Sequence, residues 1–197
     1  MPNIVKVAGH SYGERSEVIK YIIIHHTKVD LDATLKLFTI AGMPNAHYVI
    51  DKDGAIYNLL PEEHIAHHAG QQENSRWEGD SHLNRNSIGI ELVNNGCELF
   101  PEKQIASLIW LAQDIMSRYN IAPYYVLGHS DIAPSRKDDP GAHFPWQRLA
   151  EAGVGLYPTV SIDIISGAAV LACLGDEGEK VQEFQQGLAE YGYPIEV

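Results

Sequence analysis

The chain has 197 residues, of which 45% are hydrophobic and 20% are charged, as is typical of a soluble globular domain with a sizeable core. Its 14 basic and 26 acidic residues give a net charge of −12, which argues against nucleic acid or an anionic membrane surface as the main partner. Cys97 and Cys173 form no Cys-x-x-Cys pair, so a cysteine-rich zinc module is excluded. We expect two free thiols in the core, with a disulfide between them as the alternative.

No segment of the sequence is predicted to cross a membrane. The N-terminus has no apolar run of signal-peptide length. The most apolar stretch, residues 160–175, is short and carries Asp163, so we expect it to be buried in the protein.

The first half of the chain predicts a strand, a helix and a hairpin. Residues 21–27, "YIIIHHT", form a short β-rich run typical of a strand buried on both faces. A helical pattern follows at about 32–41. Residues 46–60 contain two apolar runs that meet at Asp53 and Gly54, and such a pair predicts a β-hairpin turn.

The second half predicts two more strands and a long helix. Residues 71–86 are polar and irregular, which indicates a surface loop near a site. Residues 87–93, "SIGIELV", and 124–129, "YYVLGH", are strand candidates. Between these two strands, the segment at residues 101–120 has its apolar residues on one helical face, which predicts a long helix. A loop at 128–141, "GHSDIAPSRKDDPG", follows the last strand directly.

This order of elements predicts an α/β fold with a mixed central β-sheet flanked by helices. Beyond about Leu156 the composition changes, and the last residues predict an amphipathic helix. We therefore expect a catalytic domain at 1–156 and a short C-terminal helical extension at 157–197. The extension is interpreted as the shortened start of another module, or alternatively as a lone helix that packs on the domain.

Two histidines lie where predicted strands end. His25 and His129 occupy such positions, where α/β proteins hold functional side chains rigidly. Asp139 lies downstream and precedes Pro140, which favours an extended backbone. Two imidazoles and one carboxylate, with water as the fourth ligand, form a familiar open catalytic zinc site. The alternative for this loop is a solvated "RKDD" charge cluster.

Glu91 interrupts an apolar strand, where an unpaired carboxylate costs several kcal/mol to bury. It should therefore lie at a strand end, be paired, or stay protonated. One interpretation is a salt bridge to a nearby Lys or Arg. The functional interpretation is a general acid and base beside a metal ion.

Set side by side, these pieces resemble the zinc-dependent N-acetylmuramoyl-L-alanine amidases of the type-2 amidase family, which includes the AmpD and AmiD enzymes of bacteria. The matching motifs occur in the family's order and cover about 20–146. They are "IIIHHT", "AHYVIDKDGAIYNLLPEEHIAHHAG", "NSIGIELVNNG" and "GHSDIAPSRKDDPG".

The resemblance implies a role for each matching residue. It implies that one Zn²⁺ is bound by His25, His129 and Asp139, that Glu91 is the catalytic glutamate, and that Lys137 is the basic residue beside the transition state. It also implies that His47 and His68 line the substrate cleft. The last stretch of the chain resembles the start of the helical peptidoglycan-binding module that follows the amidase domain in AmiD-type enzymes.

The implied activity is hydrolysis of the amide bond between N-acetylmuramic acid, or its 1,6-anhydro form, and L-alanine in peptidoglycan or muropeptides. The implied partners are peptidoglycan fragments, and the implied place is the bacterial envelope or the cytoplasm. The alternative is a non-catalytic peptidoglycan-recognition module, which would be expected to lack a zinc ligand. Another zinc hydrolase would not be expected to reproduce the whole order of the motifs. A structural zinc site would have no use for Lys137 and Glu91 next to the metal.

Overall fold

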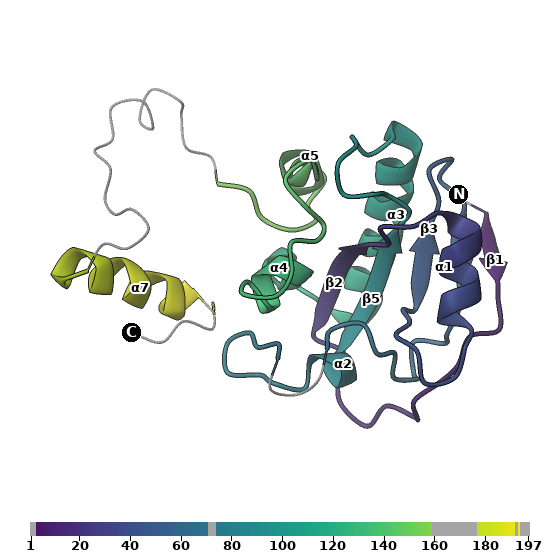
Figure 1. The fold of residues 1–197 in the computed structure, drawn as a ribbon, viewed down its shortest axis with the longest axis horizontal. Coiled ribbons are helices and arrows are strands. Elements are labelled where there is room, and N and C mark those ends of the chain that lie inside the picture. Colours follow the sequence, from purple (N-terminus) through teal and green to yellow (C-terminus); the bar gives the residue numbers. More distant parts are fainter. Residues whose placement is uncertain (1–2, 71–73, 159–176, 192, 194–197) are drawn as a thin grey trace.

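A computed structural model describes residues 3–70, 74–158, 177–191 and 193 of the chain. Within these ranges the chain forms a mixed β-sheet flanked by helices, which confirms the predicted fold class (Figure 1). No helix of the described residues is long and apolar enough to span a membrane. The stretch 160–175, predicted to be buried, lies outside the described residues.

In the part of the chain that the structure describes, six strands form one sheet in the order β1-β4-β3-β5-β2-β6. Only β3 and β4 pair in antiparallel fashion, and every other pair of neighbours is parallel. The central strands β2 and β5 are buried along their whole length, as their continuous apolar runs predict. The strands are β1 (Ile4–Lys6), β2 (Tyr21–His26), β3 (Tyr48–Ile50), β4 (Ile56–Asn58), β5 (Ser87–Leu92) and β6 (Val126–Gly128).

The turn between β3 and β4 confirms the predicted hairpin. The amide of Gly54 donates to the carbonyl of Asp51 at 2.9 Å. Gly54 has a φ of 89°, and a Cβ on it would lie 2.8 Å from the carbonyl oxygen of Lys103. Glycine is therefore required here both for the backbone conformation and for the close approach of the helix that contains Lys103.

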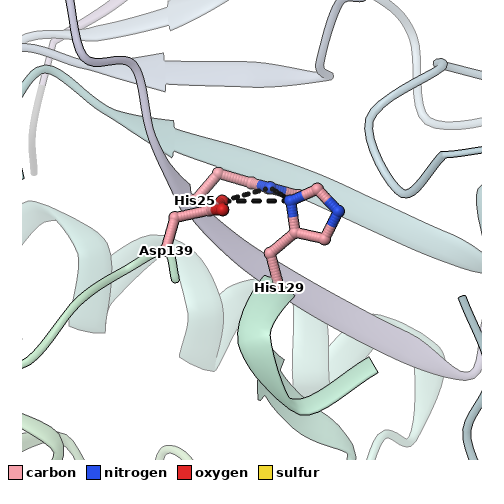
Figure 2. A group of neighbouring side chains, drawn as sticks. All are labelled: His25, His129 and Asp139. Atoms are coloured by element: carbon pink, nitrogen blue, oxygen red, sulfur yellow. Dashed lines mark hydrogen bonds and ion pairs between the residues drawn. The ribbon is translucent and has the colours of Figure 1, made fainter. Parts of the chain in front are cut away.

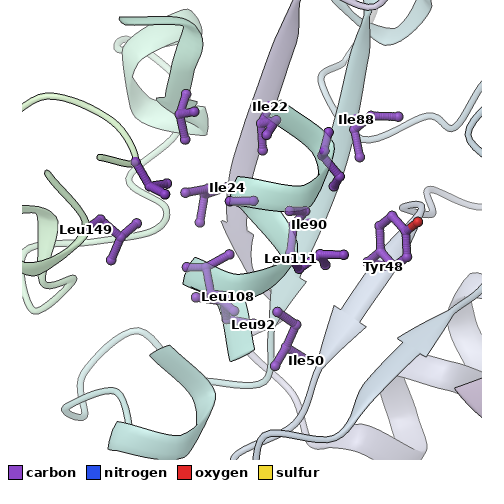
Figure 3. Packing of buried hydrophobic residues seen from close by; sticks show 14 of the residues in the cluster. Ile22, Ile24, Tyr48, Ile50, Ile88, Ile90, Leu92, Leu108, Leu111 and Leu149 are labelled. Carbon is purple, nitrogen blue, oxygen red and sulfur yellow. The ribbon is translucent and has the colours of Figure 1, made fainter. Parts of the chain in front are cut away.

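The long helix α3 (Glu102–Tyr119) covers one face of the sheet. Figure 3 shows Leu108 and Leu111 of this helix facing Ile22, Ile24 and Ile90 of the central strands. All five side chains are buried to 1% exposure or less. Each such residue contributes about 1.5–3 kcal/mol of burial free energy, so this face is the main core.

The opposite face of the sheet carries the alternate residues of the same strands, because side chains alternate along a strand. Tyr21 and Ile23 of β2 pack in a second cluster that contains Trp77. Val49 of β3 packs with Phe38 of α1 (Leu31–Phe38), so α1 and α3 cover opposite faces (Figure 1). The functional residues described below lie on the same face as these two smaller clusters.

Several predicted boundaries were wrong. Pro123–Tyr125 form a 3₁₀ turn, η1, so β6 is shorter than the predicted strand at 124–129. His129 consequently does not end a strand but begins the short helix α4 (His129–Ile132), within the predicted loop. Helix α1 ends at Phe38, before the predicted end at residue 41. Strand β1 and helix α5 (Trp146–Glu151) were not predicted.

The predicted surface loop at 71–86 is partly wrong as well. Trp77 is 1% exposed and Leu83 is 2% exposed, because both side chains pack against the sheet in the second cluster. Leu83 also begins the short helix α2 (Leu83–Asn86). Residues 71–73 of the stretch are outside the described residues. The remaining part of the stretch is anchored in the core and leads directly into β5.

The predicted C-terminal helix is confirmed as α7 (Glu179–Tyr191). Tyr191, the last residue of α7, and Tyr193 beyond it contact the domain: the Trp77 ring lies 6.3 Å from the Tyr191 ring and 5.4 Å from the Tyr193 ring, between centroids. The hydroxyl of Tyr193 donates to Asp131 at 3.2 Å. The predicted domain boundary after residue 156 stays a prediction.

The expectation of two core thiols was wrong for Cys97, which is exposed on the segment that follows β5. A polar turn at this point leaves the side chain in solvent. Cys173 lies outside the described residues, so the predicted alternative of a disulfide stays a prediction.

Candidate active site

The candidate site is built at the carboxyl ends of three neighbouring parallel strands. His25 lies near the end of β2, and its register partner on β5 is Glu91. On the other side of β2, Ile24 is paired with Gly128, and His129 follows Gly128 directly. Carboxyl ends of adjacent parallel strands share one edge of a sheet, where α/β proteins commonly bind ligands. The topology thus brings together residues that lie far apart along the chain.

His25, His129 and Asp139 point toward one another (Figure 2). The Nδ1 atom of His25 lies 2.9 Å from Nδ1 of His129 and 3.0 Å from Oδ2 of Asp139. Nδ1 of His129 lies 3.1 Å from the same Oδ2 atom. The three residues are only 1–5% exposed. Three donor atoms therefore converge on one buried point.

The charge states of these side chains suit a cation. Burial lowers the pKa of His129 to about 4, with His25 acting in the same direction, so its ring is neutral at neutral pH. Burial acts to raise the pKa of Asp139, but its contacts with His129 and His25 outweigh burial and hold it well below the ordinary value. One neutral imidazole and one ionised carboxylate are the forms in which these groups bind metals.

The backbone around α4 holds His129 and Asp139 in place. The amide of Ser130 donates to the carbonyl of Asp139 at 2.8 Å, which closes the loop between the two residues. The carboxylate of Asp131 accepts from the amide of Gly128 at 2.7 Å. A Cβ on Gly128 would lie 2.8 Å from the ring of Pro140, so this glycine lets the two ends of the loop touch. The peptide bond between Asp139 and Pro140 is cis.

Glu91 is a buried carboxylate beside the three converging residues. It is 9% exposed, and its Oε2 atom has no hydrogen-bond partner among the described residues. Burial raises the pKa of Glu91 to about 7, Asp139 adds to this rise, and His25 and Lys137 oppose it. A carboxyl group with a pKa near neutrality can both accept and return a proton.

Lys137 is half-buried and lines the cavity of about 280 Å³ that also contains Glu91 and the three converging residues. It also lines the adjoining cleft of about 520 Å³, so its side chain stands where the two hollows meet. The described lining of the larger cleft contains Arg85 and Arg136 but no carboxylate, although acidic residues outnumber basic ones in the chain. This cleft therefore favours an anionic ligand.

His68 lines both hollows and contacts His25 directly. Its Nδ1 atom lies 3.0 Å from Nε2 of His25, on the side of that ring opposite to Asp139. His68 is 7% exposed, and burial lowers its pKa well below the ordinary value, with His25 acting in the same direction. The predicted contact of His68 with substrate stays a prediction.

His47 is fully buried, and both of its ring nitrogens are bound within the protein. Nδ1 accepts from the amide of Gly89 at 3.0 Å, while Nε2 lies 3.1 Å from the carbonyl of His64 and 3.1 Å from Arg15. Burial lowers the pKa of His47 to about 4, and Arg15 lowers it further. Its predicted contact with substrate likewise stays a prediction.

Two residues that hold the site together could not be recognised from sequence patterns. The guanidinium of Arg15 lies 2.9 Å from the carbonyl of His64 and 3.0 Å from that of Ser87, and so joins two segments. The side-chain oxygen of Asn84 accepts from the amides of His68 and Ala69 at 2.9 and 2.7 Å. Both residues lie in polar stretches without periodicity, so only the folded chain reveals their contacts.

A family model described as N-acetylmuramoyl-L-alanine amidase matches residues 15–142. The chain belongs to this family. The match spans His25, Glu91 and His129 as well as Asp139, and it confirms the resemblance to type-2 amidases. The buried triad is consistent with the metal site typical of these amidases.

Curated members of the amidase family in bacteria are similar to this chain. AmiD of Escherichia coli is 43% identical over 156 residues, which cover 71% of this chain and 55% of AmiD. A putative amidase of Rickettsia conorii is 33% identical over 184 residues, which cover 89% of this chain and 66% of that protein. The chain thus spans about half to two thirds of the length of these relatives.

Two solved structures share the fold. Escherichia coli AmiD, in complex with the substrate anhydro-N-acetylmuramic acid-L-Ala-D-gamma-Glu-L-Lys, is 36% identical with a TM-score of 0.78. The match covers 91% of this chain and 74% of that one. AmpDh3 of Pseudomonas aeruginosa, in complex with anhydromuramic pentapeptide, is 31% identical with a TM-score of 0.76, covering 94% and 77%.

Proposed function

We propose that this chain is a zinc-dependent amidase, which hydrolyses the bond between N-acetylmuramic acid, or its 1,6-anhydro form, and L-alanine in peptidoglycan or muropeptides. The observation that carries the proposal is the convergence of His25, His129 and Asp139 on one buried point beside the carboxyl group of Glu91. Family membership supports the same activity, as does the similarity to enzymes with anhydromuramyl ligands.

The three converging residues fit a zinc ion. Ligand atoms around tetrahedral zinc, bonded at 2.0–2.2 Å, lie about 3.3 Å apart. The three donor atoms here lie 2.9–3.1 Å apart, so a small outward shift suffices. Two nitrogens and one oxygen, with a fourth position open toward a cavity, form the donor set of catalytic zinc sites. When bound, zinc supplies Lewis acidity, polarising the amide carbonyl and making water more nucleophilic at neutral pH.

Glu91 is proposed to move the protons of the reaction. In its ionised form the carboxylate accepts a proton from the attacking water, and it then donates this proton to the nitrogen of the departing L-alanine. A pKa of about 7 allows both steps, because neither form is strongly favoured at neutral pH. No hydrogen bond among the described residues ties up Oε2 of Glu91, so this atom is free to face substrate and water.

Lys137 is proposed to stabilise the negative charge that develops on the amide oxygen. Its position where the two hollows meet places an ammonium group between Glu91 and the wider cleft. The wider cleft is proposed to hold the peptide stem, because Arg85 and Arg136 suit the carboxylates of that stem. His68 lines both hollows and is retained as a proposed substrate-side residue. His47 lies behind it, with 5.8 Å between the ring centroids, and is retained as a proposed residue of the same region.

A non-catalytic peptidoglycan-recognition module is disfavoured by the same residues. Such a module needs the cleft but has no use for a buried carboxyl group whose burial is costly. Here Glu91 is kept beside an intact set of two imidazoles and one carboxylate. Costly buried groups that stay without partners are typical of catalytic sites.

The decisive experiment is mass spectrometry after incubation of the zinc-loaded chain with a purified anhydromuramyl tripeptide. We expect two products, the free sugar and an intact peptide that begins with L-alanine. Parallel incubation with a substrate that has a reducing-end sugar measures which form is preferred. Glu91→Gln, loaded with the same amount of zinc, is the control. Failure of the zinc-loaded wild type to release an intact peptide from either substrate would refute the proposal.

A further inference from the structure

A chain of hydrogen bonds runs from His25 away from the converging donor atoms into the protein. Nε2 of His25 lies 3.0 Å from Nδ1 of His68. Nε2 of His68 lies 3.2 Å from the hydroxyl of Ser87. That hydroxyl in turn donates to the main-chain carbonyl of Leu83. We call His25, His68, Ser87 and the carbonyl of Leu83 the histidine relay.

The carbonyl at the end of the histidine relay fixes the direction of every proton in it. A carbonyl oxygen can only accept, so the single hydrogen of the Ser87 hydroxyl is committed to Leu83. Ser87 must then accept from Nε2–H of His68. A neutral imidazole carries one N–H, which leaves Nδ1 of His68 as an acceptor for Nε2–H of His25.

This direction leaves Nδ1 of His25 without a proton, so its lone pair faces His129 and Asp139. The carboxylate of Asp139 can only accept, so in the metal-free protein Nδ1 of His129 is the donor to both. The reverse direction, with Ser87 donating to His68, would place the proton of His25 on Nδ1 and block coordination there. Metal-bound histidines usually donate their second N–H to a fixed acceptor, and this contact sets the tautomer and the ring orientation. In this chain the acceptor is another imidazole.

The protein backbone is shaped around the ring of His68. A Cβ on Gly89 would lie 2.4 Å from Cγ of His68, so the ring occupies the space that any side chain at this position of β5 would need. Glycine within a strand weakens it and often marks a close approach. Asn84 accepts from the amide of His68 and fixes the main chain on the other side. The ring of His68 is thus held by His25, Ser87 and the close approach of Gly89, and its main chain is held by Asn84.

We propose that His68 is a positioning residue, which together with Ser87 holds His25 in the tautomer and orientation that bind the metal ion. This inference rests on the proposed metal-dependent function. It adds to that function the residues that orient the proposed metal ligand His25. His68 acts through His25, and its effect is therefore on metal binding rather than on substrate chemistry.

Two measurements test the histidine relay, using His68→Phe, His68→Asn and Ser87→Ala. The first is the zinc dissociation constant, from competition with a chelator. We expect weaker binding by about 10–100-fold in His68→Phe, the size typical of such supporting contacts, and a smaller loss in Ser87→Ala. His68→Asn should recover much of the affinity, since its amide oxygen can accept from His25.

The second measurement is the tautomer of His25 in the metal-free protein, from nitrogen-15 NMR of its imidazole ring. We expect the proton on Nε2 in the wild type and a mixture of tautomers in Ser87→Ala. Ser107→Ala is the matched control, because Ser107 is a buried serine of α3 whose hydroxyl also donates to a carbonyl, that of Gly54. It should change neither readout.

The outcomes separate this inference from the proposed function. A wild type that binds no zinc contradicts the proposed function, and the NMR measurement still tests the relay in that case. If the wild type binds zinc, and if His68→Phe and Ser87→Ala have the same zinc affinity and the same His25 tautomer as the wild type, the relay is overturned and the proposed function stands. If His68→Phe does not fold, Ser87→Ala decides in the same way through both readouts.

Discussion

His25 and Glu91 are register partners on the adjacent parallel strands β2 and β5, so the first converging histidine and the buried carboxyl group stand side by side at one edge of the sheet. Their side chains lie on the face opposite α3, because the residues that precede them, Ile24 and Ile90, point into the main core and side chains alternate along a strand. Packing of α3 against β2 and β5 therefore holds in place the strands that carry the site. A proton-transfer group needs such a rigid support in order to stay within reach of its substrate.

Glu91→Gln should abolish nearly all hydrolysis while leaving zinc content and fold unchanged. An amide of the same size cannot accept the proton of water, and loss of a general base typically lowers turnover by about 10²–10⁴-fold. The measurement is turnover of an anhydromuramyl peptide, together with metal analysis of the same sample. Wild-type turnover in the variant would contradict the role proposed for this residue.

The same substitution should stabilise the metal-free protein at pH 8. Because burial raises the pKa of Glu91 from 4.5 to about 7, the folded state binds this proton more tightly than the unfolded state does. The contribution of Glu91 to stability is therefore lost as pH rises through 7, by about 3 kcal/mol at most. Urea unfolding with a chelator present should show a gain for Glu91→Gln that is larger at pH 8 than at pH 4.5. An equal gain at both pH values would show that the carboxyl group is not titrating as described.

Asp139→Ala should release the metal, and Asp138→Ala should not. Asp139 is 5% exposed and shares its Oδ2 atom with both histidines. Its neighbour Asp138 is exposed and pairs with Lys28 at 3.1 Å. Loss of a direct ligand should weaken zinc binding by more than the 10–100-fold typical of a supporting residue. Zinc content after dialysis against a weak chelator measures the difference, and equal retention by the two variants would exclude Asp139 as a ligand.

Sequence patterns predicted those elements of the fold that are determined by residues close together in the sequence. The continuous apolar runs of β2 and β5 predict buried strands, and Glu91 stands out because an acidic residue breaks such a run. The turn at Gly54 follows from the short-range preference of an Asp-Gly pair.

Other features depend on contacts between distant segments, and no local pattern encodes them. His68 and His25 are 43 residues apart in the sequence, and Arg15 reaches the carbonyl of Ser87 across 72 residues. The burial of Trp77 within a polar stretch likewise depends on Tyr21 and on the C-terminal tyrosines. Such contacts form only when the folded sheet brings distant segments side by side, and this is why the histidine relay could not be predicted.

Lys137→Ala should lower kcat much more than it raises KM. The ammonium group is proposed to stabilise charge that appears only in the transition state, and removal of one such contact typically costs about 10²–10³ in kcat. Steady-state kinetics on the anhydromuramyl tripeptide measure both constants. Lys103→Ala on the exposed side of α3 removes the same charge far from the cleft and should leave both unchanged. A rise in KM alone would instead assign Lys137 to substrate binding.

Glu62→Gln should destabilise the protein at pH 7 but not in acid. The buried carboxylate of Glu62 accepts from the hydroxyls of Tyr48 and Tyr119 at 2.7 Å each, and Arg118 pairs with it from a partly exposed position. Burial acts to raise the pKa of Glu62, but the hydrogen bonds outweigh burial and lower it from 4.5. The unfolded state therefore binds this proton more tightly, so the stabilisation is complete above pH 4.5 and is lost as pH falls through the folded-state pKa.

We expect Glu62→Gln to cost about 1.5–3 kcal/mol at pH 7, the range for hydrogen bonds to a charged group. The cost should shrink as the pH falls below 4.5, because the wild-type carboxyl group then becomes neutral as well. Urea unfolding of both proteins across this pH range measures the difference. Glu63→Gln is the matched control, because its side chain is exposed beside the same turn and its loss should matter little at any pH. A cost for Glu62→Gln that stays constant with pH would mean that shape, and not charge, makes this residue stabilising.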